Sequence, residues 1–79
     1  MKKNEDRIEI ASDVSQRDGI GVEIYRNNEL IVEIFRDDTE KSRTITTYKK
    51  DISLELMEES IEIFKKEIPW EFIDYGKFE

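Results

Sequence analysis

The sequence has no cysteine and no histidine among its 79 residues, and it has only one proline and three glycines. Without cysteine, a disulfide framework, a thiolate nucleophile and a cysteine-ligated zinc site are excluded. Without histidine, the commonest general base near neutral pH is missing, and no Ser-His catalytic arrangement can be built. We therefore expect a protein that is not an enzyme and that carries no cofactor or metal.

Long apolar runs are also missing from the sequence. No segment approaches the roughly 20 apolar residues that a membrane-spanning helix needs. The N-terminal Met1, Lys2 and Lys3 are followed by polar residues rather than by an apolar signal region. We therefore expect a cytoplasmic protein with no membrane partner. Its length suits one small domain over residues 1–79, with a frayed N-terminus over residues 1–6.

Positive charge is scarce in the second part of the chain. The whole sequence has 13 basic and 20 acidic residues and a net charge of −7. Residues 1–50 carry a net charge of −1, whereas residues 51–79 carry −6. Such a field repels nucleic acid, which we exclude as a partner. It favours a partner protein that presents a basic surface to the C-terminal part.

Residues 20–35 have the alternating pattern of a β-hairpin. The alternating aliphatic residues are Ile20, Val22 and Ile24 on the first arm and Leu30, Val32 and Ile34 on the second. A three-residue loop at 26–28, with Asn28 in the left-handed conformation, would place Ile24 opposite Leu30 and all six on one face. A two-residue turn at 27–28 would mix the two sets across both faces. We therefore predict the three-residue loop.

The predicted register has consequences for the charged residues of the hairpin. It opposes Asp18 to Arg36 and Arg17 to Asp37, and such pairs stabilise a register modestly. It also makes Glu23 and Glu33 diagonal neighbours on the second face of the hairpin. Two carboxylates can in principle share acid and base roles, but solvated strand glutamates are the simpler interpretation.

The rest of the pattern predicts a meander and one helix. Residues 7–11 alternate weakly and indicate a short edge strand, while residues 43–48 have the threonine and aromatic content of a further strand. A helix is predicted from Leu54 to about Ile68, capped by Ser53 or Asp51 and stopped by the proline at position 69. The predicted fold class is α+β: a three- or four-stranded antiparallel β-meander packed against one C-terminal α-helix.

Two hydrophobic stripes run along the predicted helix. The predicted core stripe consists of Leu54, Met57, Ile61, Phe64 and Ile68. Leu56 and Ile63 lie on another side of the helix and need another cover, which the aromatic tail can supply. The glutamates of the helix, Glu55, Glu58, Glu59 and Glu62, are predicted to face outward.

The candidate binding residues follow from these placements. The outward glutamates and the tail aromatics Trp70, Phe72 and Tyr75 are the candidate partner-binding residues, since aromatic side chains serve both as core residues and as interface anchors. The second sheet face, with Tyr25, Ile31 and Phe35, lacks a helix and is the candidate contact of a homodimer. Asp18, Asp37 and Asp38 are the one cluster that suggests a hard cation, although the nearby arginines compete for their oxygens.

Two segments carry a resemblance to known proteins. The runs Arg17-Asp18-Gly19-Ile20-Gly21-Val22-Glu23 and Glu33-Ile34-Phe35-Arg36-Asp37-Asp38, followed by a helix before Pro69-Trp70, look like short uncharacterised bacterial proteins built from a meander and one helix. The resemblance covers roughly residues 17–72 and implies no functional residue. In size, acidity and lack of catalytic residues the chain is also similar to small bacterial immunity or inhibitor proteins.

These observations favour one function and leave two alternatives. The favoured function is a non-enzymatic, acidic protein-binding module, such as an inhibitor or immunity-type factor, which docks a basic protein through the helix glutamates and the aromatic tail. The first alternative is a structural homo-oligomer that uses the exposed sheet face. The second is a small metal-dependent enzyme that uses the three aspartates.

Overall fold

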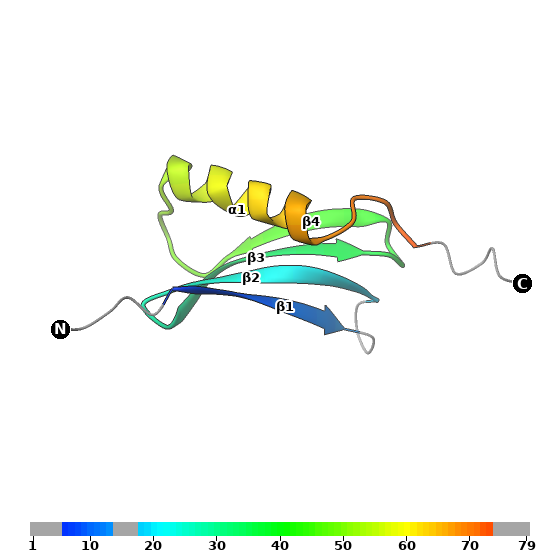
Figure 1. Ribbon diagram of the computed structural model, residues 1–79, viewed down its shortest axis with the longest axis horizontal. Coiled ribbons are helices and arrows are strands. Elements are labelled where there is room, and N and C mark those ends of the chain that lie inside the picture. The colour runs from blue at the N-terminus through cyan, green and yellow to red at the C-terminus, as the bar shows by residue number, and fades with distance from the viewer. Residues whose placement is uncertain (1–5, 14–17, 74–79) are drawn as a thin grey trace, which may run out of the picture.

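The computed structural model describes residues 6–13 and 18–73. Four antiparallel strands form one sheet in the order β1-β2-β3-β4, with β1 at Arg7–Asp13, β2 at Gly19–Arg26, β3 at Glu29–Asp37 and β4 at Ser42–Thr47. The helix α1 at Leu54–Glu67 follows β4 and lies across one face of the sheet, over β2 and β3 (Figure 1). The predicted α+β meander with one C-terminal helix is therefore confirmed, and it has four strands.

The turn between β2 and β3 differs from the prediction. Both Asn27 and Asn28 have positive φ angles, 53° and 64°, which is typical of a two-residue type I′ turn. The backbone amide of Asn27 donates a hydrogen bond to the carboxylate of Asp6 (2.9 Å), which fixes Asp6 instead of leaving it frayed. The other residues of the predicted frayed segment, 1–5, lie outside the described residues.

A β-bulge explains why the aliphatic side chains of the hairpin still share one face although its turn has only two residues. Tyr25 pairs with Leu30, but Ile24 pairs with Val32, so Ile31 is the extra residue. The pairs Ile24 with Leu30 and Val22 with Val32 were therefore wrong; the register is shifted by two residues. The bulge breaks the alternation of β3, since the adjacent Ile31 and Val32 both lie in the core. The sequence pattern hides it because Leu30, Ile31 and Val32 are all aliphatic.

The hydrophobic core lies between α1 and the two central strands. Its buried members are Val22, Ile24, Ile31, Val32, Ile34, Phe64 and Ile68. The bulge brings Ile31 into this core, while Leu30 pairs with Tyr25 on the opposite face. The single aliphatic face of the hairpin thus exists, with Ile31 in place of Leu30.

The helix begins and ends as predicted, but it is rotated relative to the predicted core stripe. Ser53 is the N-cap, and its hydroxyl accepts a hydrogen bond from the amide of Leu56 at 3.1 Å. Ser60 and Phe64 are the buried helix residues. Leu54 lies about 120° around the helix from Ser60 and is 68% exposed, so its place in the core stripe was wrong.

The second hydrophobic stripe of the helix is covered by the core and does not need the aromatic tail. Leu56 and Ile63 lie within about 60° of Ser60, and both pack against the core. Ser60 permits this close packing because its side chain is small and its hydroxyl donates to the carbonyl of Leu56 at 2.8 Å. Among the described residues, no helix is long and apolar enough to cross a membrane.

Candidate functional site

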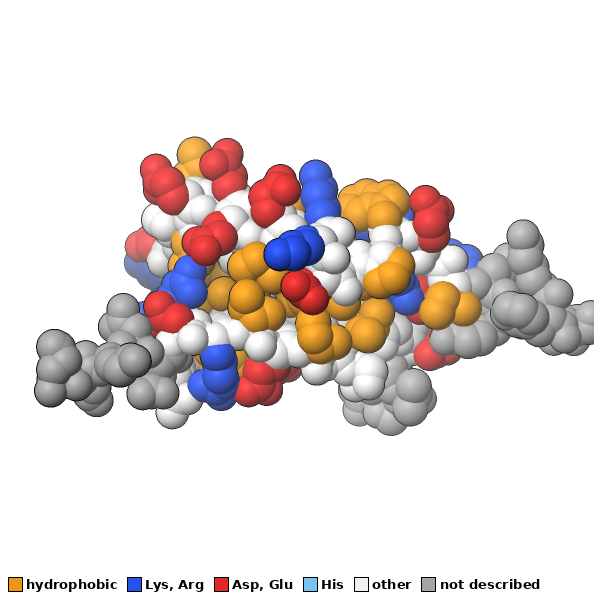
Figure 2. All heavy atoms as spheres, viewed as in Figure 1, with side chains coloured by type: hydrophobic (Ala, Val, Ile, Leu, Met, Phe, Trp, Pro, Cys, Tyr) orange, Lys and Arg blue, Asp and Glu red, His pale blue; other side chains and the backbone are white. Residues whose placement is uncertain are grey.

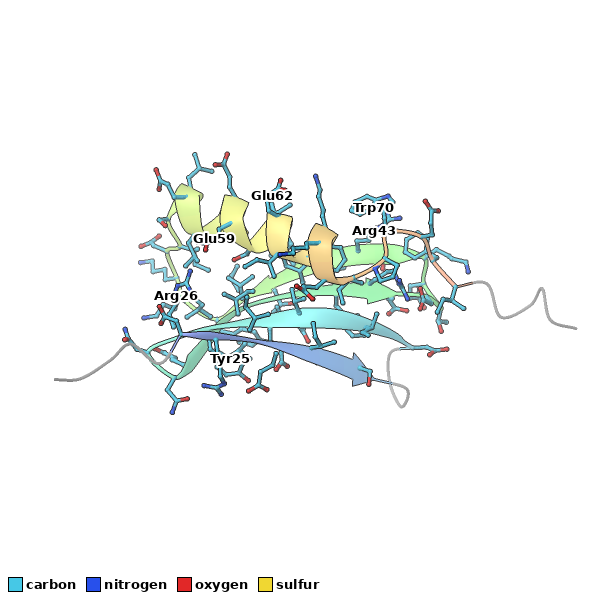
Figure 3. The ribbon with its side chains drawn as sticks, viewed as in Figure 1. Tyr25, Arg26, Arg43, Glu59, Glu62 and Trp70 are labelled. Atoms are coloured by element: carbon cyan, nitrogen blue, oxygen red, sulfur yellow. The ribbon has the colours of Figure 1, made fainter. Side chains whose placement is uncertain are left out.

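The outer face of α1 is acidic and exposed. Glu55, Glu58, Glu59 and Glu62 are all exposed, as the sequence predicts. Acidic side chains gather over the outer side of the helix in Figure 2, and Figure 3 shows Glu62 pointing away from the sheet. We call the stripe formed by Glu55, Glu58 and Glu62 the acidic ridge.

The acidic ridge forms no close ion pair within the described structure. In the described part of the chain, Glu59 pairs with Arg26 at 3.2 Å, whereas no residue of the acidic ridge has an ion-pair partner. Glu58 and Glu62 are four residues apart on the helix, a spacing at which like charges repel by a few tenths of a kcal/mol. Glu62 and Lys66 have the same spacing with opposite charges, and Glu55 lies in the first turn of the helix, so these small terms favour the fold and offset the repulsion. The charges of the ridge therefore make little net contribution to the stability of the fold.

Exposed apolar side chains lie near both ends of the acidic ridge. Leu54 is in the first turn of α1, and Trp70, two residues beyond the C-cap Ile68, is 49% exposed. Figure 3 places Trp70 beyond the last turn of the helix, on its outer side. Exposed aromatic side chains next to charged groups are common anchors in protein interfaces.

Trp70 is held in place by Arg43 of β4. The Arg43 guanidinium stacks on the Trp70 ring at 3.8 Å and on the Phe72 ring at 4.1 Å, and it donates two hydrogen bonds to the Trp70 carbonyl at 3.2 and 2.8 Å. Phe64 meets Trp70 edge to face, with ring centroids 6.4 Å apart. Trp70 is therefore both a packed residue and an exposed one. Tyr75, the last candidate tail aromatic, lies outside the described residues.

The three aspartates that suggested a cation site have structural roles instead, one in a buried ion pair and the others in backbone hydrogen bonds near a turn. Arg36 and Asp38 are both buried and form two parallel hydrogen bonds at 2.9 and 3.0 Å. Arg36 also donates to the carbonyl of Pro69 at 2.7 Å, and Asp38 accepts the amide of Ile73 at 3.1 Å. The pair thus fastens the segment after α1 to the end of β3.

The other two aspartates accept hydrogen bonds from backbone amides at the same end of the sheet. One Asp37 carboxylate oxygen accepts the amides of Thr39 and Glu40, both at 3.0 Å, and the Asp18 carbonyl accepts the amide of Asp38 at 2.7 Å. The predicted pair of Asp18 with Arg36 was wrong, because Asp38 holds that guanidinium. The predicted opposition of Arg17 to Asp37 was also wrong, because Asp37 lies opposite Gly19; Arg17 itself lies outside the described residues.

A hollow of about 250 Å³ opens beside this ion pair. It is lined by Ser12, Asp18, Gly19, Ile20, Arg36, Asp38 and Ile73. Its buried charges already bind each other. In the described ranges, 6–13 and 18–73, no three acidic residues are placed to share a metal ion.

Three glutamates form a row on the face of the sheet away from α1. Glu9 pairs directly with Glu23, and Glu23 pairs directly with Glu33. The diagonal placement of Glu23 and Glu33 was therefore wrong, because the register is shifted. Glu33 is only 6% exposed, so the interpretation as a solvated strand glutamate was also wrong for it.

Tyr25 is tied into this row by its neighbours. Its hydroxyl donates to Glu23 at 3.1 Å, and the Arg7 guanidinium lies 3.9 Å above its ring and pairs with Glu9 at 2.7 Å. Partial burial raises the pKa of the Tyr25 phenol, and the carboxylates of Glu23 and Glu9 raise it further, while Arg7 lowers it. Tyr25 is thus uncharged near neutral pH.

Two of the three candidate dimer contacts are buried. Ile31 is 2% exposed in the core, and Phe35 is 1% exposed. The Phe35 ring lies against Gly21 and Gly19, where a Cβ atom would come within 2.9 and 3.1 Å of it, respectively. These side chains therefore offer no exposed surface to a second copy, which corrects that interpretation.

No protein-family model, curated protein or solved structure matches the chain significantly. Functional inference therefore depends on the geometry described above. The exposure of the helix glutamates could be predicted from the sequence, but the role of Arg36 and Arg43 in holding the segment after α1 was not predicted. The pairing of β3 with β4 places Arg36 opposite Arg43, so that their side chains lie on the same face of the sheet. A correct prediction of this pairing from the sequence would have indicated their shared role.

Proposed function

We propose that the protein is a non-enzymatic binding module that docks a basic protein surface on the outer face of α1. The carrying observation is the acidic ridge, which is exposed and unpaired in the described structure and has Leu54 near one end and Trp70 near the other. An inhibitor or an immunity-type factor would use such a surface.

The charges of the surface support this proposal. A stripe of three glutamates presents three formal negative charges along one side of a helix, in a chain whose net charge is −7. Complementary charges steer association and select the partner, while exposed aromatic side chains act as anchors in protein interfaces. The ridge and its two apolar neighbours combine both features on one face.

The experiment compares two charge-matched variants as bait for proteins of the source organism. E58Q/E62Q removes two charges from the acidic ridge, and E29Q/E40Q removes two from exposed glutamates elsewhere. We expect the wild type and E29Q/E40Q to retain the same basic protein, and E58Q/E62Q to lose most of it. Retention should fall when salt screens the charges.

Three outcomes contradict the proposal, the first two of which concern retention. One is equal retention of the captured protein by all three baits, and the other is retention that does not change between low and high salt. A captured protein without a basic surface also contradicts it. Purified partner and titration calorimetry then give the affinity of each variant.

A further inference from the structure

The strand β4 is an edge of the sheet, and the helix does not cover it. The helix α1 packs over β2 and β3 but not over β4. Residues 44–47 are all exposed, and Ile45, which lies on the helix side of the sheet opposite Ile34, is 47% exposed. Among the described residues, no strand pairs with the outer side of β4. An edge strand of this kind presents its free backbone groups to a further strand.

The backbone groups that face the open side of β4 can be assigned. The amide of Tyr48, the residue after β4, donates to the Ile31 carbonyl of β3 at 2.9 Å. Successive residues of a strand direct their amides and carbonyls to opposite sides. The backbone groups of Arg43, Ile45 and Thr47 therefore point away from β3. These are the groups that an added strand would bond.

The β4 edge is basic in an otherwise acidic protein. Residues 41–50 contain four basic residues and no acidic one, whereas the whole chain has a net charge of −7. The four basic residues are Lys41, Arg43, Lys49 and Lys50. Within the described structure only Lys49 has a carboxylate partner, Glu29 at 3.7 Å. A second copy of β4 would bring like charges together, whereas an acidic segment would neutralise them.

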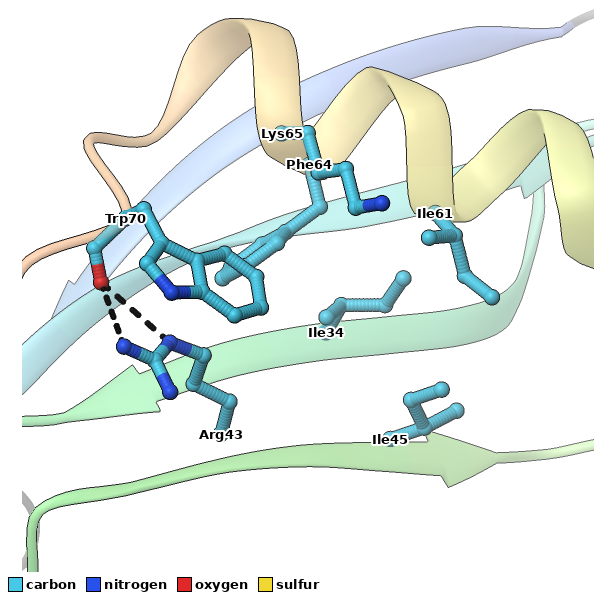
Figure 4. Close-up of a pocket in the computed structure, with 7 residues that line it drawn as sticks. All are labelled: Ile34, Arg43, Ile45, Ile61, Phe64, Lys65 and Trp70. Atoms are coloured by element: carbon cyan, nitrogen blue, oxygen red, sulfur yellow. Dashed lines mark hydrogen bonds between the residues drawn. The ribbon is translucent and has the colours of Figure 1, made fainter.

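A cavity between β4 and α1 has room for one apolar side chain. It measures about 150 Å³, the size of a protein cavity that holds one benzene molecule. Figure 4 shows Ile45 of β4 on one side of it, Ile61 and Phe64 of α1 on the other, and Trp70 at one end. An added strand lies about 4.8 Å beyond β4. Its side chain opposite Ile45 therefore lies next to this cavity.

We propose that β4 binds an extended, acidic segment of another protein, which joins the sheet as a further strand. Its backbone bonds the free groups of Arg43, Ile45 and Thr47, its carboxylates lie beside the basic residues of 41–50, and one apolar side chain enters the cavity. This inference goes beyond the proposed function, because it concerns a second partner of opposite charge at another surface. Trp70 borders both surfaces, so the test observes β4 itself.

The probe is the synthetic peptide Glu-Thr-Val-Thr-Leu-Thr-Glu-Thr-Glu, acetylated and amidated at its ends. Antiparallel to β4, it places its leucine opposite Ile45 and a glutamate opposite Arg43. The control peptide has glutamine in place of every glutamate and is neutral. Amide hydrogen exchange of the full chain is measured by NMR with and without each peptide, and titration in the same spectra gives the affinities.

We expect the acidic peptide to bind saturably and to slow exchange at Arg43, Ile45 and Thr47, whose amides face solvent. Exchange at Thr44 and Thr46 should not change, because their amides face β3. The neutral peptide should bind about tenfold more weakly at low salt.

Four outcomes overturn the proposal. They are a lack of saturable binding, equal binding of the two peptides, slowed exchange at β1, the other edge strand, instead of β4, and slowed exchange at β4 when the chain is concentrated without peptide. The last outcome would show that a second copy occupies the edge.

Thr47 provides a matched pair of variants. Thr47→Pro removes an amide on the open side of β4, where an edge strand tolerates proline, and Thr47→Ala keeps that amide. Thr47→Pro should bind the acidic peptide about tenfold more weakly than Thr47→Ala, because one hydrogen bond to the added strand is lost. Equal binding by the two variants overturns the proposal. The exchange pattern of the wild type tests the proposal even if Thr47→Pro does not fold.

Discussion

The Arg36–Asp38 pair and the acidic ridge carry charge in opposite ways. At the end of β3 the two charges are buried, paired and bonded to the segment after α1. On the outer face of α1 three carboxylates are exposed and have no ion-pair partner in the described structure. The first region uses charge to hold the fold together, whereas the charges of the second interact with the fold only weakly.

This difference separates structural charge from charge that is available for binding. Burial makes a charge costly unless its partner is present, so the removal of one partner is strongly destabilising. An exposed charge without a partner contributes little to stability and is free to interact with another molecule. The comparison therefore predicts a large effect of substitutions in one region and almost none in the other.

The largest effect is expected for Asp38→Asn. This change leaves the Arg36 guanidinium buried beside a neutral amide, and should lower the free energy of unfolding by about 3–5 kcal/mol. Urea denaturation measures the loss. Arg26→Gln, which breaks the ion pairs of the partly exposed Arg26 with Glu59 and Asp6, is the control and should cost less than about 1 kcal/mol. Similar losses for both variants would show that burial does not distinguish the two pairs.

A smaller effect is expected for Arg43→Gln. The substitution removes two hydrogen bonds to the Trp70 carbonyl and the stacking on Trp70 and Phe72. Because Arg43 is only partly buried, we expect a loss of about 1–2 kcal/mol. Trp70 fluorescence should also shift to that of a more solvated indole. A variant with unchanged fluorescence would contradict the anchoring role of Arg43.

Several elements could be predicted from the sequence because local signals agree. The helix bounds follow from Ser53 and from the proline after Ile68, and the outward glutamates follow from helical periodicity. The hairpin register could not be predicted. The two-residue turn at 27–28 and the bulge at Ile31 each change which side chains face the core, and the two changes compensate each other. The Arg36–Asp38 pair also could not, because it depends on burial by a segment more than 30 residues away.

A still smaller effect is expected from the ionisation of Tyr25. Its pKa is raised above the ordinary value of 10.0, chiefly by partial burial and then by Glu23. The neutral phenol therefore contributes stability that is complete below about pH 10 and is lost as the pH rises through the raised pKa. Unfolding free energies measured at about pH 9 and about pH 11 should fall more for the wild type than for Y25F. Equal falls would contradict this assignment.

The measurement that tests the central claim most directly is the free energy of unfolding of E58Q/E62Q. The variant removes the repulsion between Glu58 and Glu62 and also the attraction between Glu62 and Lys66, two effects of similar size and opposite sign, so we expect stability to stay unchanged within a few tenths of a kcal/mol. A loss of more than about 1 kcal/mol would show that these glutamates stabilise the fold, and would contradict the account of the ridge as a surface kept for a partner.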